Sequence, residues 1–243
     1  MAQPNLILRR GTPPNTKGLE RVQLVLGTSL VRFGQVSRYA YFPLSGVISL
    51  VSVTGTGKAV EVSAIGRNGV AGAFATVVGG LSPFELLVQV PGAAIRADRT
   101  ALLNLLSPKY ALGEVVQFAH LLIAEIAQSS VCNRYHRSDR RLARWLLTLS
   151  DRAETDTLPM THETIALLTG TVRPRVTTAM DDLRRHGVLR YRRGQVTIVD
   201  RPALARRCCE CYSIVSQLFT TPTRKNVLTA PHRVNAAARS ESI

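Results

Sequence analysis

The sequence predicts an α+β protein in three parts: an N-terminal antiparallel β jelly roll, one long helix, and a C-terminal winged helix-turn-helix. Three patterns support this prediction. Short apolar runs separated by glycine-containing turns follow one another from about residue 20 to residue 96. After Lys109 the apolar residues recur every three to four positions, which is the helical period. Residues 160–199 then have the order helix, glycine turn, helix and basic hairpin.

The first part has the pattern of a β sandwich or jelly-roll barrel. Apolar runs at 22–26, 46–53, 59–65 and 85–90 are bounded by turn residues, as is typical of many short antiparallel strands. Hydrophobic residues make up 45% of the chain, which is enough for a substantial core. Because only 5% of the residues are aromatic, we expect that core to be aliphatic.

Apolar side chains line one side of the predicted long helix. They are spaced three and four residues apart over two heptads, as in a coiled-coil seam. Few charges interrupt the segment, so the helix is poorly suited to lie alone in water. We expect it to pair with the same helix of a second copy; the alternative is burial within its own monomer. The residues expected at this dimerisation seam are Leu112, Val115, Ala119, Leu122 and Ile126.

Local signals define the two helices and the hairpin of the third part. Thr161 is suited to cap the first helix, and Gly170 supplies the turn that ends it. The second helix is expected from about Thr171 to Gly187. Such a pair places its second helix in the major groove of DNA. Residues 192–194 lie between two runs in which apolar and polar residues alternate. This pattern predicts a β-hairpin, or wing, with a basic tip. The alternative is a merely solvated basic face.

A net charge of +15 favours a polyanionic partner, and the charge is concentrated in the C-terminal half. Residues 1–131 hold 11 Lys and Arg against 6 Asp and Glu, whereas residues 132–243 hold 20 against 10. The start of a recognition helix reaches base edges, and flanking groups meet phosphates. We therefore expect base contacts from Arg173, Arg175, Thr177 and Thr178, and phosphate contacts from Thr161, His162, Arg192, Arg193 and Arg140.

Other classes of protein have little support in the sequence. No apolar run reaches the roughly 18 residues of a membrane span, and the first residues lack the plan of a secretory signal. A cytoplasmic protein without membrane association is expected. Cys208, Cys209 and Cys211 cluster, but adjacent side chains diverge and no spaced second pair exists, so no metal ligand is assigned. No iron–sulfur cluster or haem is indicated. No arrangement of nucleophile and base suggests catalysis, so no catalytic residue is assigned and no enzyme is expected.

Several motifs resemble those of the Crp/Fnr transcription regulators. The similarity runs from about residue 20 to residue 212, and its most specific pieces are Cys132-Asn133-Arg134-Tyr135-His136, Arg141-Leu142-Ala143-Arg144-Trp145-Leu146-Leu147, Met160-Thr161-His162-Glu163, Arg190-Tyr191-Arg192-Arg193-Gly194 and Cys208-Cys209-Glu210-Cys211-Tyr212. The resemblance implies a homodimer that binds palindromic promoter sites and contacts RNA polymerase. It also implies three segments: a cyclic-nucleotide-binding-like β-domain (19–108), a dimerisation helix and hinge (109–137) and a winged helix-turn-helix domain (138–212). The composition of the remaining residues (213–243) predicts a disordered basic tail.

The recognition helix departs from the pattern of this family. Well-studied members begin it with Arg-Glu and place a further Arg about one turn later. Here Arg173 matches, but Pro174 stands at the Glu position and Thr178 at the later Arg position. A Glu side chain that accepts a hydrogen bond from cytosine contacts a base directly, and so does an Arg side chain that donates hydrogen bonds to guanine. The family's best-known operator is therefore not expected to be the site of this protein.

The sensor also departs from the family pattern. Members that bind cyclic nucleotides hold the ribose with a Glu and the cyclic phosphate with an Arg. In the corresponding stretches Ala73 stands near the Glu position, and residues 81–86 contain no Arg. A buried phosphate without a cation would cost several kcal/mol, so cyclic AMP is not expected to bind and the effector is unknown. Arg67 is the one nearby cation.

Two other functions fit part of the sequence. The first is a nucleotide-sensing regulatory subunit that acts on a protein partner through its winged domain. The second is a constitutive DNA-binding protein whose β-domain serves only as a dimer scaffold. No motif in the sequence predicts the operator or the direction of the effect on transcription.

Overall fold

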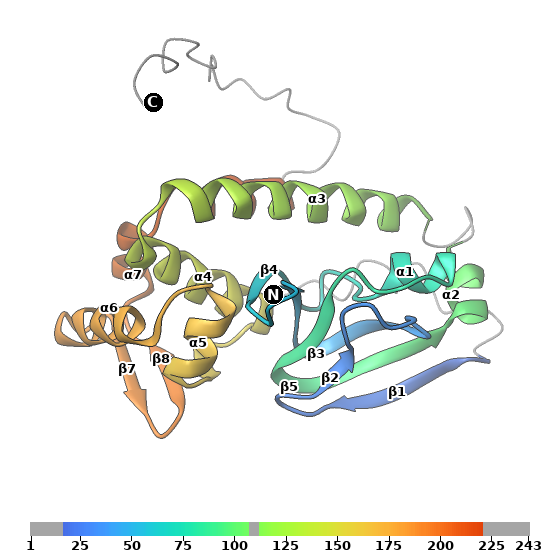
Figure 1. Ribbon diagram of the computed structural model, residues 1–243, viewed down its shortest axis with the longest axis horizontal. Helices are drawn as coiled ribbons and strands as arrows, with labels where there is room; N and C mark the ends of the chain where they lie inside the picture. The colour runs from blue at the N-terminus through green and yellow to red at the C-terminus, as the bar shows by residue number, and fades with distance from the viewer. Residues whose placement is uncertain (1–16, 107–111, 221–243) are drawn as a thin grey trace, which may run out of the picture.

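The computed structural model describes residues 17–106 and 112–220, and the predictions made for residues outside these ranges lie beyond the described part of the chain. The predicted α+β class is confirmed: an antiparallel β-domain is followed by the long helix α3 (Leu112–Tyr135) and by a helix-turn-helix with a small sheet. Figure 1 shows α3 running across both halves of the molecule, with the β-domain at one end and the helix-turn-helix at the other.

The β-domain is built around two long central strands. Strand β3 (Tyr39–Val53) pairs along most of its length with β5 (Glu85–Asp98), and the sheet has the order β1-β5-β3-β4 with antiparallel pairing between these neighbours. Its core is mainly aliphatic, as the composition predicts. The remaining elements of this domain are β1 (Leu19–Leu24), β2 (Ser29–Val31), β4 (Ala59–Ile65), α1 (Ala73–Val78) and α2 (Arg99–Leu105).

Helix α3 places its apolar side chains on two faces. Val115, Phe118 and Leu122 are buried in the core of the β-domain. This corrects the expected dimerisation seam, because Val115 and Leu122 are already used within the protomer. Ala119 and Ile126 are half-buried and Leu112 is exposed. The apolar stripe without a partner in the described residues instead contains Leu112, Val116, Ile123 and Val131.

Helix α3 is long enough and apolar enough to cross a membrane. The sequence did not indicate this property, because it contains no unbroken apolar run of that length. One such helix is weak evidence, since the core helix of a soluble protein has the same properties. Here the helix carries a buried carboxylate: Glu125 pairs with Arg152 of the following helix at 3.4 Å. The helix is therefore integrated with both halves of the fold.

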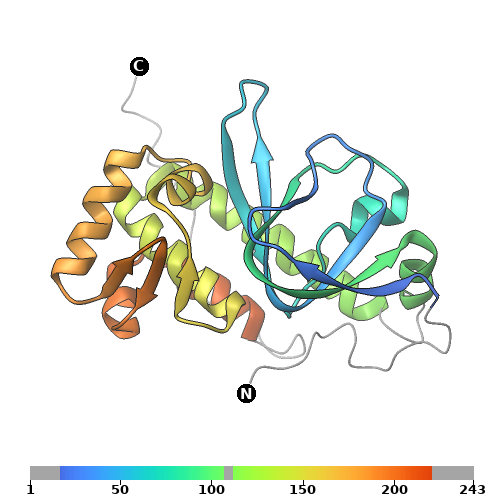
Figure 2. The same cartoon turned by 90° about the horizontal axis from the view of Figure 1, so that it is seen from below.

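The C-terminal domain packs its helices around Trp145 and a set of buried aliphatic residues from the helix-turn-helix and the wing. Figure 2 shows these helices gathered at one end of α3, beside the β-domain. The elements are α4 (Ser138–Ala153), β6 (Thr157–Pro159), α5 (His162–Leu168), α6 (Arg173–Arg185), β7 (Leu189–Arg192), β8 (Gln195–Ile198), α7 (Arg201–Arg207) and α8 (Cys211–Thr220).

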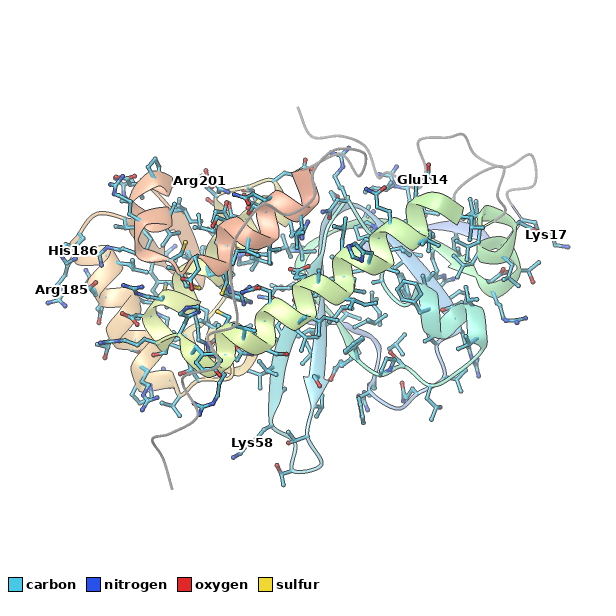
Figure 3. The ribbon with its side chains drawn as sticks, turned by 90° about the horizontal axis from the view of Figure 1, so that it is seen from above. Lys17, Lys58, Glu114, Arg185, His186 and Arg201 are labelled. Carbon is cyan, nitrogen blue, oxygen red and sulfur yellow. The ribbon has the colours of Figure 1, made fainter. Side chains whose placement is uncertain are left out.

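Helix α8 differs from the sequence prediction, which placed a disordered tail from residue 213. The helix continues to Thr220 because Cys211 and Val215 are buried on its inner face. Figure 3 shows α8 lying beside α3. The rest of the expected tail lies outside the described residues. The turn between α3 and α4 contains only His136 and Arg137, because α3 continues one turn beyond Cys132.

Polar contacts join the two domains beside α3. Trp145 of α4 donates its indole N–H to Glu61 Oε1 of β4 at 2.7 Å. Ser63 Oγ donates to Glu125 Oε2 at 2.9 Å, on the same carboxylate oxygen that lies 3.4 Å from Arg152. The two domains of the protomer are thus connected by hydrogen bonds between β4, α3 and α4.

Candidate nucleic-acid interface

The turn between α5 and α6 is built as the sequence predicts. Thr161 caps α5, its hydroxyl accepting from the Thr164 N–H at 3.2 Å. Gly170 follows the end of α5 with φ at 60°, a left-handed conformation that favours glycine. A Cβ on this residue would also lie 3.2 Å from the Val60 side chain of β4. The chain then re-enters a helix at Arg173, which sets α6 against α5.

Helix α6 buries one face and exposes the start of the other. Val176, Met180 and Leu183 are buried against the domain, three or four positions apart. Arg173 and Arg175 are exposed at the first turn. Pro174 causes no break, because amides in the first helical turn have no intrahelical partner. The first turn of α6 therefore presents two guanidinium groups to solvent.

Arg173 already has an acidic neighbour. Its guanidinium lies 2.7 Å from Glu163 Oε1 of α5, and both side chains are more than half exposed. An exposed ion pair of this kind contributes at most about 1 kcal/mol to the free energy of unfolding. The pair therefore orients Arg173 at the start of α6 without removing it from solvent.

His162, predicted from the sequence as a phosphate contact, is half-buried between α6 and the wing. Its Nδ1 lies 3.0 Å from Thr177 Oγ1 of α6, and its ring packs at 4.6 Å against the ring of Tyr191 in the wing. The half-buried Thr177 is held by the same contact. Tyr191 was not predicted from the sequence, although its inward place in an alternating strand could have indicated it. These three residues tie α5, α6 and the wing together.

The wing is a tight hairpin with an arginine pair at its tip. Arg192 pairs with Gln195 across strands β7 and β8, and Arg193 and Gly194 form the two-residue turn with φ of 49° and 73°. Positive φ at both positions is the geometry of a type I′ hairpin turn. Arg192 and Arg193 are exposed. Strand β6, which was not predicted from the sequence, pairs with β8 and supports the hairpin from the other side.

The remaining predicted residues are also at the surface. Thr178 is exposed, and its hydroxyl donates to the Pro174 carbonyl at 3.0 Å, which is the usual bond back along the helix. Thr161 and Arg140 are exposed as well. Figure 3 labels Arg185 and His186, which lie at the opposite end of α6 from Arg173 and are the outermost labelled groups on this side of the molecule.

Comparison with known proteins identifies the type of the C-terminal domain. The model of the Crp-like helix-turn-helix domain matches residues 140–207, which include α5, α6 and the wing. Residues 140–207 therefore form a Crp-like helix-turn-helix domain. Helix-turn-helix domains of this type bind DNA. No curated protein sequence matches the chain.

Solved structures share the fold over most of the chain. A CRP-family regulator of Thermus thermophilus is 19% identical with a TM-score of 0.65, covering 76% of this chain and 95% of its own. A CRP/FNR-family regulator of the same organism is 24% identical with a TM-score of 0.63, covering 77% and 97%. FixK2 of Bradyrhizobium japonicum is 16% identical with a TM-score of 0.60, covering 79% and 98%. At these identities the likeness concerns the fold.

The β-domain contains an apolar pocket of about 290 Å³. It lies between β3, α1, β5 and α3, and its lining includes Leu50, Phe74, Leu86 and Leu122. None of the described residues that line it is charged. Ala73 is buried at the start of α1. Arg67 does not serve this pocket either, since it lies 3.2 Å from Glu154 at the end of α4.

Proposed function

We propose that this protein binds a pseudo-palindromic promoter site as a homodimer and there contacts RNA polymerase in the cytoplasm. The main support is the first turn of α6, where Arg173 and Arg175 are exposed on a helix whose opposite face is fixed in the domain. Base reading is assigned to these two residues together with Thr177 and Thr178. Phosphate contacts are assigned to Arg192 and Arg193 at the wing tip, and to Thr161.

The dimer is proposed to form along the exposed stripe of α3. Val116 is 61% exposed and Ile123 is 67% exposed, and Leu112 and Val131 extend the stripe toward both ends of the helix. Burying such side chains contributes about 1.5–3 kcal/mol each. A second copy of α3 is the natural partner, because a two-fold axis would also present two α6 helices to successive major grooves.

The β-domain is proposed to sense a signal other than cyclic AMP. The pocket between β3, α1, β5 and α3 is apolar, and none of its described lining residues offers a cation to a cyclic phosphate. Leu122 of α3 lines this pocket, so a ligand there would contact the helix that leads to the DNA-binding domain. Such a ligand would shift an existing equilibrium between domain orientations.

Isothermal titration calorimetry with cyclic AMP tests the sensor assignment. The expected result is no saturable heat at micromolar to millimolar nucleotide, because no described lining residue can pair with the phosphate. A saturable micromolar signal would overturn this assignment. The DNA-binding assignment would be unaffected.

A gel-shift titration tests the main proposal against its rivals. Sequence-selective binding should weaken linearly on a log–log plot against salt, since phosphate contacts release counterions. The double variant R192A/R193A should lower that slope by about one for each phosphate group that is no longer neutralised. A regulatory subunit that acts only on a protein partner would show no selective binding at any salt concentration.

A further inference from the structure

Four metal-ligand side chains meet where the end of α3 contacts the segment between α7 and α8. Cys132 lies in the last turn of α3 and His136 directly follows that helix, whereas Cys209 precedes α8 and Cys211 is its first residue. Their donor atoms all lie within 4.8 Å of one another. The three thiols are buried and His136 is half-buried.

We propose that Cys132, His136, Cys209 and Cys211 bind one Zn²⁺ ion in a closed structural site. Three thiolates and one imidazole are a common donor set of tetrahedral zinc sites. With Zn–S near 2.3 Å and Zn–N near 2.0 Å, the edges of the tetrahedron are about 3.7 Å between sulfurs and about 3.5 Å between sulfur and nitrogen. The Cys132 and Cys209 sulfurs lie 3.5 Å apart, and Cys211 Sγ lies 3.5 Å from His136 Nδ1. The donors are therefore already close to the required spacing.

The groups around these donors have the arrangement of a metal site's outer shell. His136 turns Nδ1 toward the sulfurs while Nε2 lies 3.1 Å from Glu210 Oε1. A carboxylate on the far nitrogen fixes the tautomer and orientation of a metal-binding histidine. Gln128 Nε2 also donates to Cys211 Sγ at 3.1 Å. The tripeptide 209–211 thus supplies two ligands and the carboxylate that orients a third.

The neighbouring Cys208 provides a contrast within the same segment. Its thiol donates to the Ala205 carbonyl at 3.0 Å and is not part of the cluster. The expectation that adjacent cysteine side chains diverge is therefore met by Cys208 and Cys209. The spaced second pair that was not found in the sequence is Cys132 with His136, a mixed pair at the end of α3 that lies more than 70 residues earlier.

The site would lie directly beside the turn between α3 and α4. Two ligands come from the end of α3 and the turn that follows it, and two come from the end of the C-terminal domain. Bound zinc would cross-link these parts and stabilise the folded chain by its binding free energy. This role does not depend on the proposed DNA contacts, and its test needs no DNA.

The test measures metal in the full chain, purified without chelators from zinc-containing medium. Mass spectrometry of metals is expected to give about one zinc per chain and little iron. Cobalt(II) added to the zinc-free chain should give the absorption of a tetrahedral thiolate complex. A chain that holds no stoichiometric zinc and gives no such cobalt spectrum would overturn the proposal, as would a Cys132–Cys209 disulfide in the freshly purified protein.

Matched variants assign the ligands. Cys209→Ser and His136→Ala should lose the zinc, whereas Cys208→Ser should keep it. Because loss of a buried ligand can unfold the domain, Glu210→Gln is the second variant: it keeps all four donors and should weaken zinc binding 10–100-fold in competition with a chelator. Equal loss of metal in Cys208→Ser and Cys209→Ser would contradict the assignment, and so would an unchanged affinity in Glu210→Gln.

Discussion

Arg173 illustrates how magnitudes decide the role of one side chain. In the free protein its guanidinium lies 2.7 Å from Glu163. This exposed pair contributes at most about 1 kcal/mol, whereas a bidentate contact with guanine discriminates by about 1–3 kcal/mol. We therefore expect Arg173 to leave Glu163 on its cognate DNA site.

Arg173→Ala should lose about 1–3 kcal/mol of binding free energy on the cognate duplex and should relax selectivity at one base pair of each half-site. Fluorescence anisotropy with matched and mismatched duplexes measures both effects. Arg32→Ala is the control, because it removes the same charge from an exposed position of the β-domain. Unchanged affinity for the Arg173 variant would remove this residue from base reading.

Glu61 makes the junction between the domains sensitive to pH. Burial raises the pKa of Glu61 to about 7, although hydrogen bonds from Ser49 and Trp145 oppose the shift. Between about pH 4.5 and 7 the folded protein thus retains a proton that the unfolded chain has released. The contribution of Glu61 to stability is present at low pH and falls as the pH rises through this window.

Glu61→Gln should remove this pH dependence, because the amide can still accept from Trp145 and meet Ser49 without ionising. From pH 5 to pH 8 the free energy of unfolding of the wild type should fall by about 2 kcal/mol relative to that of the variant. Urea unfolding of both proteins at the two pH values gives the comparison. Parallel pH profiles would show that Glu61 titrates normally.

At the scale of elements, local signals were sufficient for the helix-turn-helix and the wing. The Thr161 cap, the turn at Gly170 and the Arg193-Gly194 hairpin each depend on a few neighbouring residues, and the structure has all three. Long-range geometry could not be predicted in the same way. Helix α3 has apolar residues on two faces, and its periodicity alone does not show which face meets the β-domain. The structure assigns Val115 and Leu122 to the protomer core.

In the candidate site, too, local sequence signals predict some features, whereas others depend on long-range contacts. Exposure of Arg173, Arg175, Arg192 and Arg193 follows from the helical period and from the hairpin turn. The inward position of His162 depends on contacts with α6 and the wing, which the sequence alone does not place. The meeting of His136 with Cys211 depends likewise on the packing of α8 against α3.

Ile123→Asp should convert the proposed dimer to a monomer. Ile123 is the most exposed apolar side chain of the α3 stripe, and a charge there would have to be desolvated in a helix pair. Sedimentation velocity measures the outcome. Val25→Asp places the same charge at an exposed apolar residue of the β-domain, and this variant should stay dimeric. Dimeric Ile123→Asp would place the interface elsewhere.

At the scale of the whole molecule, α3 connects every part with a proposed role. Leu122 lines the apolar pocket, Glu125 pairs with Arg152 of α4, and Cys132 in the last turn of α3 is one of the four clustered donors. Breaking a buried ion pair such as Glu125–Arg152 costs about 3–5 kcal/mol. Signals from the β-domain can therefore reach the DNA-binding domain through α3, because the same helix is packed against both domains.

Selection of bound sites from random duplex DNA, with the protein purified as expressed, tests the central claim most directly. Two α6 helices related by a two-fold axis should enrich an inverted repeat whose half-sites lie one helical turn apart, about 34 Å centre to centre. Recovery of such a repeat from the wild type, and its loss with R173A/R175A, is the predicted result. Enrichment of no sequence, or of a single site without inverted symmetry, would contradict it.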